Sequence, residues 1–507
     1  MFEGRSSSRV ALSLLPFLIA GIFAVRNLAT WPARISYPGD EAYEGVALAD
    51  MVHLRQRVPI YTAEAKDGFS DGTYGPLYYM LGARLTNPER PSYIPLRMLS
   101  MFAMFGCALC CGVLAFWLTR SYWVAGLSPV VFLAYGMVTG HGILALSDGG
   151  AVFLAFVGFL VAYHFRDGRW ILLAAPVMVL SVFYKPQYIA GPAAVILYLL
   201  IEKRYKLAAL FAGLLGICGL GLLVFFQFAV FPGQAFCRHF LFFQAPLLNW
   251  RGFVFRTLAA FAIVILPGLI LGLDYLRLYR DKLIVLYLCV SLALGMLTYS
   301  KDGSDVHYFF ESVFILCVLA AAVITEKIRG RVYPTDLVVL LGVTLVMAQW
   351  NTRRPPKAGD WSKYEAIESY LRQNFSPHAV SLCSSPGELL QAGLDAPYAG
   401  MFQLEALSQR GVVSDGPLVS RVEKRQFVLI ILRIDAQREK DPYWKTFALS
   451  SGVLQAVRRQ YRLRATLDMP GPLRERPQDR FYIYVPRPEA NPGVHGGQGV
   501  LTRVAGD

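Results

Sequence analysis

Three acidic residues stand close together in the polar stretch that separates the first two hydrophobic segments. Asp40, Glu41 and Glu44 lie in GDEAYEG, and the stretch returns to apolar sequence at TYGPLYY. A carboxylate within hydrogen-bond reach of a hydroxyl can accept its proton while the oxygen attacks an electrophilic carbon. Desolvation beside a membrane raises the pKa of such a carboxylate toward the useful range. The alternative is that Asp40 caps the following helix and the other acids favour its first turn. We interpret the three acids as candidate catalytic residues.

Other ionisable side chains recur beside apolar segments. Asp148 begins the apolar run SDGGAVFLAF, where it could either support the chemistry or cap the helix. Lys185, in FYKPQYIAG, is flanked by apolar sequence and needs an anionic partner; a phosphate at the membrane surface would serve, and snorkelling to the interface is the alternative. Arg97 starts another apolar segment, and its planar guanidinium suits bidentate phosphate contact.

A late segment, SKDGSDVHYFFES, places further polar groups ahead of an apolar helix. Asp305 and His307 could contact sugar hydroxyls or a divalent ion, although one histidine with spaced acids is a weak metal signature. Glu311 lies about one turn into the apolar helix and is predicted to face a polar cavity. Tyr308 could contact substrate or belong to an interfacial aromatic belt. We therefore predict no metal site and no other cofactor.

Aromatic residues mark the re-entry into apolar sequence. Tyr74 and Tyr78 could stack on a sugar or an isoprenoid, and an interfacial belt is the alternative.

Composition assigns the chain to the polytopic α-helical membrane proteins. Of its 507 residues, 55% are hydrophobic and 17% are charged, and the mean hydropathy is +0.43. The net charge of +14 comes partly from short basic clusters between apolar segments, so nucleic acid is not a predicted partner. Six of the eight cysteines lie inside apolar segments, which excludes a disulfide framework built on them: Cys107, Cys110, Cys111, Cys218, Cys289 and Cys317.

Apolar segments of bilayer length predict about eleven transmembrane helices. They span 10–28, 95–118, 122–140, 149–165, 170–184, 187–201, 207–231, 253–275, 283–299, 308–325 and 334–350. The two segments around YKPQY are short, which indicates a broken or tilted pair.

Alternate loops between these segments carry lysine or arginine, as the positive-inside rule requires for an N-terminus in the cytoplasm. They hold Arg120, Arg166, Arg169, Lys203, Arg204, Lys206, Arg277, Arg280, Lys282, Lys327, Arg329 and Arg331. All the candidate site residues then fall on the opposite, outer side of the membrane.

Composition also divides the chain. Residues 1–350, including an outer loop at 30–92, form the predicted membrane domain. Residues 351–485 alternate helical patterns with the strand-like runs AVSLC, FVLIILRI and FYIYV, which predicts a small extracytoplasmic α/β domain. Residues 486–507 are rich in proline and glycine and are predicted to be a disordered tail.

In order along the chain, several motifs resemble those of the GT-C superfamily of glycosyltransferases, which use polyprenyl-phosphate sugars. The resembling motifs are GDEAYEG, YGPLYYMLGARL, PLRMLS, LSDGGAVFLAF, YKPQYIAG and GSDVHYFFES. They are most similar to bacterial relatives of dolichyl-phosphate-mannose–protein mannosyltransferases and of lipid A aminoarabinose transferase. The resemblance covers roughly residues 10–350.

This resemblance implies a bacterial inner-membrane enzyme with its active site on the periplasmic face. The implied donor is a polyprenyl-monophosphate sugar, transferred with inversion to a lipid, polysaccharide or protein hydroxyl. By position, Asp40 is implied as the base with Glu41 beside it, and Asp148 as a supporting acid. Lys185 and Arg97 are implied as contacts of the donor phosphate.

Two departures leave alternatives open. His307 stands where asparagine is commoner, and Glu44–Gly45 resembles an acid–glycine pair of another branch, so Glu44 could be the base. A secondary transporter is a rival, although no pair of matching halves is visible. A non-catalytic envelope assembly protein is the second rival, with the C-terminal domain as its interaction module.

Overall fold

The computed structural model describes residues 7–39, 43–70, 72–243, 253–254, 257–258, 260–301, 304–330, 335–350, 354–437, 449–469 and 480–488. Asp40 and Glu41 lie outside the described residues. So do residues 489–507 of the predicted tail.

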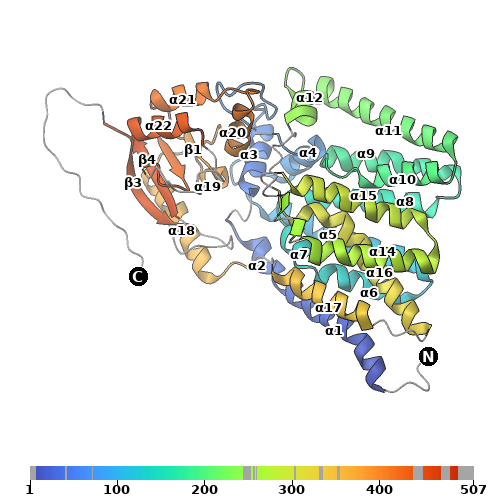
Figure 1. The fold of residues 1–507 in the computed structure, drawn as a ribbon. Coiled ribbons are helices and arrows are strands. Elements are labelled where there is room, and N and C mark those ends of the chain that lie inside the picture. Colours follow the sequence, from blue (N-terminus) through green and yellow to red (C-terminus); the bar gives the residue numbers. More distant parts are fainter. Residues whose placement is uncertain are drawn as a thin grey trace, which may run out of the picture.

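A helical bundle makes up the first two thirds of the chain (Figure 1). Its described elements are α1 (Ser7–Ala29), α2 (Trp31–Ser36), α5 (Ile94–Thr119), α6 (Tyr122–Ala134), α7 (Gly136–His141), α8 (Asp148–His164), η1 (Arg169–Leu173), α9 (Ala174–Tyr184), α10 (Ala190–Ile201), α11 (Tyr205–Phe225), η2 (Phe226–Val230), α12 (Phe236–Arg238), η3 (His239–Phe243), η4 (Phe261–Ile265), α14 (Leu266–Tyr279), α15 (Lys282–Tyr299), η5 (Val306–Phe309), α16 (Phe310–Arg329) and α17 (Thr335–Trp350).

These helices identify a polytopic membrane protein. Within the described ranges, six helical stretches are long and apolar enough to cross a bilayer: Leu15–Ser36, Ile94–Thr119, Tyr205–Val230, Phe261–Tyr279, Lys282–Tyr299 and Val306–Lys327. Shorter apolar helices occupy Tyr122–Ala134, Asp148–His164, Arg169–Tyr184 and Ala190–Ile201. Each predicted apolar segment is thus mainly helical where it is described, while the number that cross the membrane stays a prediction.

The break inside YKPQY has a local cause. Pro186 disfavours a helical conformation at the residue before it, and Lys185 is extended, with φ −152° and ψ 119°. α9 therefore ends at Tyr184, and α10 begins at Ala190. This confirms the predicted broken pair and leaves Lys185 at the junction of two helices.

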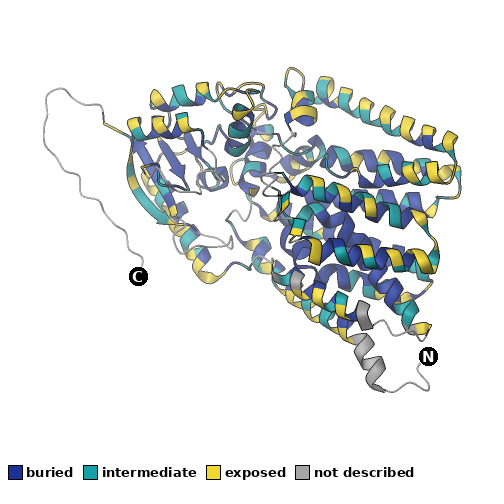
Figure 2. Cartoon of the chain, in the orientation of Figure 1, coloured by how far each residue is buried: buried dark blue, intermediate teal, exposed yellow. Residues whose placement is uncertain are grey.

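Polar groups gather at both ends of the bundle. At the end with the basic loops, Arg166 pairs with Asp281 at 3.0 Å and Lys327 pairs with Asp274 at 2.6 Å. The candidate site residues belong to the other end. Between the two ends α11 exposes large apolar side chains such as Leu210 and Ile217 (Figure 2), which suits a lipid-facing helix. Which end faces the cytoplasm stays a prediction.

A small mixed sheet forms the C-terminal part of the protein. It lies next to the end of the bundle that carries the candidate site residues (Figure 1). Its strands are β1 (Ser381–Cys383), β2 (Leu429–Leu432), β3 (Tyr461–Asp468) and β4 (Arg480–Pro486), in the order β1-β2-β4-β3. β1 is parallel to β2, and the other pairs are antiparallel. The described helices around it are α18 (Ala358–Asn374), α19 (Pro386–Gln391), α20 (Met401–Gln409), α21 (Gly416–Glu423) and α22 (Ser451–Gln460). The three predicted strands and the α/β character are confirmed, whereas β3 was not predicted.

The outer loop packs between the bundle and the sheet. Its helices are α3 (Glu44–Arg55) and α4 (Pro76–Leu85). Ala49 and Val52 of α3 belong to the same apolar cluster as the inner residues of α18, α19 and the sheet. Phe69 bridges to Tyr398, with its amide donating to the Pro397 carbonyl at 2.9 Å.

His53 lies in this contact region. Its Nδ1 is 3.1 Å from the Ser70 hydroxyl, and burial lowers the pKa of His53 from 6.5 to about 4. At neutral pH the imidazole is therefore uncharged.

Candidate active site

A buried ion pair lies at the end of the bundle that carries the candidate site residues. Asp148 begins α8, and Lys185 occupies the break between α9 and α10; the Lys185 Nζ is 2.7 Å from Asp148 Oδ1. Tyr188 donates its hydroxyl to the same oxygen at 3.0 Å. Asp148 is 2% exposed and Lys185 is 7% exposed, so the pair is largely removed from water. Because Asp148 already fixes the Lys185 side chain, the lysine loses little conformational entropy when an anionic ligand binds.

Two histidines approach this pair from α7 and η5. The His307 Nε2 is 3.8 Å from Asp148 Oδ1, and the His141 Nε2 is 3.4 Å from Asp305 Oδ2. The two imidazole rings lie 5.6 Å apart. The structure thus brings the late polar segment to the head of α8, although these groups are about 160 residues apart in sequence.

Aromatic rings flank the lysine. Lys185 Nζ lies 5.4 Å from the centre of the Tyr74 ring and 5.5 Å from that of Tyr308. Both distances fall within the range of a cation–π interaction. Tyr78 is fully buried and donates its hydroxyl to the Ala145 carbonyl at 2.7 Å. Tyr74 and Tyr308 therefore lie at the cluster, whereas Tyr78 supports the chain that leads into Asp148.

The turn at Gly75, which leads into α4, packs against the last residues of α9. The Gly75 amide donates to the Tyr184 carbonyl at 3.1 Å, and a β-carbon at Gly75 would overlap the Phe183 carbonyl. Only glycine allows the two backbones to come this close.

A second buried ion pair anchors the segment that carries the acidic motif. Arg97, at the start of α5, donates from Nε to Glu44 Oε1 at 2.9 Å, and its Nη2 contacts Glu44 Oε2. Both side chains are fully buried. The same guanidinium donates to the carbonyls of Arg34, Tyr37 and Gly39. Gly39 and Glu44 lie on either side of Asp40 and Glu41 in the sequence, so one arginine binds the chain on both sides of these two acids.

The Arg97–Glu44 pair is also hydrogen-bonded to the chain just before Asp148. Glu44 Oε1 accepts the Ala145 amide at 2.5 Å, three residues before Asp148. The contacts do not favour the predicted phosphate role of Arg97 or the alternative role of Glu44 as base, because both groups are enclosed and engaged with each other. We interpret the two as positioning residues. The roles of Asp40 and Glu41 stay predictions.

Glu311 faces the bundle interior, as expected for an acid in an apolar helix. It accepts the Tyr287 hydroxyl at 2.8 Å and a hydrogen bond from the Gly191 backbone. Gly191 lies in the first turn of α10, where amides lack partners within the helix. Glu311 thus holds the helix that follows Lys185.

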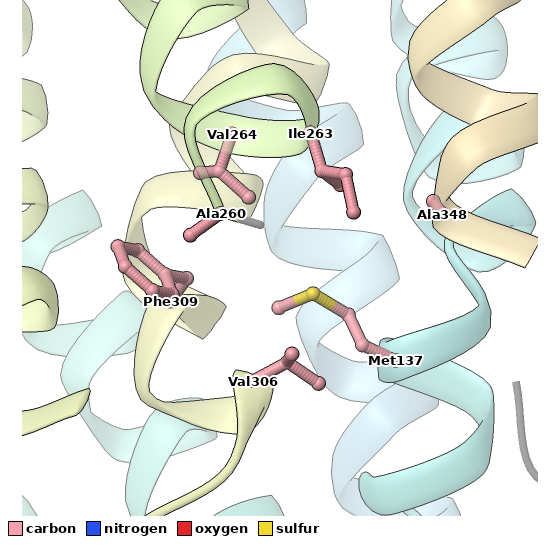
Figure 3. A pocket seen from close by; sticks show the side chains of 7 residues that line it. All are labelled: Met137, Ala260, Ile263, Val264, Val306, Phe309 and Ala348. Carbon is pink, nitrogen blue, oxygen red and sulfur yellow. The ribbon is translucent and has the colours of Figure 1, made fainter. Parts of the chain in front are cut away.

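An apolar pocket is lined in part by residues that are close in sequence to the two histidines (Figure 3). Seven residues from α7, the η4 region, η5 and α17 line it: Met137, Ala260, Ile263, Val264, Val306, Phe309 and Ala348. Val306 and Phe309 are near neighbours of His307 in η5, and Met137 lies one helical turn from His141. The polar cluster therefore borders an apolar recess.

His141 and Tyr188 were missed by sequence reasoning. His141, in GHG, carries no partner signal in the sequence, and Tyr188, in YKPQY, was not singled out. Among the described residues, no group of three histidine, cysteine or acidic side chains has the arrangement of a metal site.

No family model matches the chain, and no curated protein matches it. The fold, however, is similar to solved structures. ArnT from Cupriavidus metallidurans bound to undecaprenyl phosphate matches with a TM-score of 0.55 and 14% identity, over 91% of this chain and 97% of that one. Its apo state matches over the same shares, with a TM-score of 0.55 and 13% identity.

The Archaeoglobus fulgidus oligosaccharyltransferase complex with Zn and sulfate is also similar. It has a TM-score of 0.51 and 14% identity, over 92% of this chain and 72% of that one. The chain therefore shares its fold with ArnT and with the oligosaccharyltransferase, which is the fold that the resemblance implied.

Proposed function

We propose that the protein transfers a sugar from a polyprenyl-phosphate donor to a hydroxyl acceptor, with inversion, on the periplasmic face of the inner membrane. The observation that carries this proposal is the Asp148–Lys185 pair, buried at the polar end of the bundle, flanked by Tyr74 and Tyr308. A lysine in this setting suits a phosphate at the membrane surface. The fold shared with ArnT, solved with undecaprenyl phosphate bound, supports the same donor class.

The proposed reaction is a single displacement. The acceptor oxygen forms a bond to the anomeric carbon while the bond from that carbon to the phosphate oxygen breaks. The acceptor proton passes to a carboxylate, proposed to be Asp40 with Glu41 beside it. The bonding electrons leave with the polyprenyl phosphate, and Lys185 stabilises the growing negative charge.

The surrounding residues take positioning and binding roles in this proposal. Asp148 holds Lys185 in place before the donor arrives and keeps the empty site close to neutral. His307 and Tyr308 contact the sugar, as does Tyr74. The apolar recess next to η5 accommodates part of the lipid. Because a phosphomonoester is the leaving group, the displacement needs no metal.

Reconstituted vesicles test the proposal. Wild-type protein, Lys185→Met and the control Lys66→Met, an exposed lysine on the outer loop, receive labelled polyprenyl-phosphate sugars and a panel of acceptors. We expect transfer by the wild type and the control, and a loss of about 10- to 100-fold in Lys185→Met, the effect of one charge-assisted hydrogen bond. Equal activity in all three would remove Lys185 from the mechanism. Uptake of a solute without transfer would instead favour a transporter.

A further inference from the structure

The C-terminal domain touches the outer loop close to the Arg97–Glu44 pair. Tyr37, whose carbonyl accepts from Arg97, is fully buried, and its ring meets Trp361 and Tyr364 of α18 edge-on, at 5.6 and 6.5 Å. A rigid aromatic contact of this kind fixes the backbone that carries the ring. α18 therefore lies directly behind one of the carbonyls that Arg97 binds.

A polar contact joins the same two regions. Arg34 donates from Nη2 to the Arg354 carbonyl at 3.2 Å, and the Arg34 carbonyl accepts from Arg97 at 2.8 Å. Arg354 in turn pairs with Asp360 of α18 through two contacts, at 2.7 and 3.2 Å. A bidentate arginine–carboxylate pair is geometrically specific. The start of α18 is thus tied to Arg97 through Arg34.

A third contact places α19 next to the Arg97–Glu44 pair. Gly387 of α19 faces α3: a β-carbon there would lie 3.0 Å from the Gly45 α-carbon and would overlap the Tyr93 hydroxyl. Gly45 follows Glu44 directly, and the Tyr93 ring lies under the Arg97 guanidinium, at 4.9 Å. A β-carbon at Gly387 would therefore displace the Tyr93 hydroxyl and crowd the backbone beside Glu44.

From these contacts we infer that α18 and α19 are positioning elements of the active site. They fix the Arg97–Glu44 pair, and Glu44 in turn holds the Ala145 amide and thereby the chain that leads into Asp148. Every link in this series is a contact between described residues. The inference rests on the proposed function only for its effect on catalysis, because the mechanical link exists whatever the reaction is. A displacement of about 1 Å at such a site costs on the order of 100-fold in rate.

The test compares two glycine-to-alanine variants within the C-terminal domain. Gly387→Ala inserts a methyl group against Gly45 and Tyr93. Gly359→Ala, in α18, is the matched control, because a β-carbon there meets nothing within 4 Å. Trp361→Leu is a second perturbing variant for the case that Gly387→Ala folds poorly, since Trp361 is only partly buried.

Two readouts separate the positioning role from the reaction. The first is hydrogen exchange of the Ala145 amide, which is bonded to Glu44; we expect exchange roughly tenfold faster in Gly387→Ala and Trp361→Leu than in Gly359→Ala. The second is the rate of sugar transfer, expected to fall about 10- to 100-fold in the same two variants, with thermal unfolding close to that of the control.

Each outcome decides something. Faster exchange at Ala145 with no transfer by any form, the wild type included, would leave the positioning role standing and remove the proposed function. Unchanged exchange at Ala145 in both perturbing variants would overturn the positioning role. Equal loss of transfer in Gly359→Ala would overturn it as well, because the effect would then belong to any change in the domain.

Discussion

Breaking the Arg97–Glu44 pair should lower the free energy of unfolding of the protein, rather than act directly on sugar transfer. Arg97→Met leaves the Glu44 carboxylate fully buried beside the Ala145 amide, and it removes the donor from three backbone carbonyls. Separating a buried ion pair destabilises a protein by about 3–5 kcal/mol. Glu44→Gln keeps the shape but leaves the buried Arg97 guanidinium without its counter-charge, so we expect a similar cost of about 3–5 kcal/mol.

A double-mutant cycle tests this reasoning. The double variant should be less destabilised than the sum of the two singles, by about 1–3 kcal/mol, because neither charge is then left alone. Unfolding of the purified protein in detergent, followed by tryptophan fluorescence, measures all four forms. If Glu44→Gln kept wild-type stability but abolished transfer, Glu44 would be the base and our interpretation of the pair would be wrong.

Three further outcomes follow from the contacts. Tyr188→Phe removes the hydroxyl that donates to the Asp148 carboxylate, so transfer should slow about tenfold. Tyr184→Phe leaves the bonds from Lys185 and Tyr188 to that carboxylate in place and should stay within about twofold. Gly75→Ala should lower both stability and transfer, because its methyl group overlaps the α9 carbonyl; Gly126→Ala, with open space around it, is the control, and equal behaviour of the two in thermal unfolding would contradict the close approach. The lowered pKa of His53 means that the unfolded chain binds one more proton than the folded chain between pH 4 and 6.5. The free energy of unfolding should therefore rise with pH across this window, by up to about 3 kcal/mol in total. If the pH dependence of unfolding is equally steep in His53→Gln, this expectation is wrong.

The fold was predictable because its dominant signal is local. Bilayer-length apolar segments and the alternation of basic loops need no knowledge of distant contacts, and they gave the helices and the grouping of the polar residues at one end. The broken pair at Lys185 was predicted from the shortness of its two segments, and Pro186 gives its local cause. β3 was missed because it continues from α22 without a turn signal, so the pattern ran together with the preceding helix.

The site was harder to predict because pairing is a tertiary property. Lys185 required an anion, and the sequence offered no way to know that Asp148 supplies it. Arg97 and Glu44 each looked available for chemistry, yet they are enclosed by each other and by backbone carbonyls. His141 gave no signal at all, since its neighbour Asp305 is far away in the sequence.

The most direct test of the account is the fate of the donor lipid. Wild-type protein should release one equivalent of free polyprenyl phosphate for each sugar transferred, and the product should have the inverted anomeric configuration. Asp40→Asn, provided it unfolds at the wild-type temperature, should form neither product. Retained configuration, or transfer without release of the phosphomonoester, would contradict the proposed single displacement, and full activity of Asp40→Asn would contradict the role of Asp40 as its base.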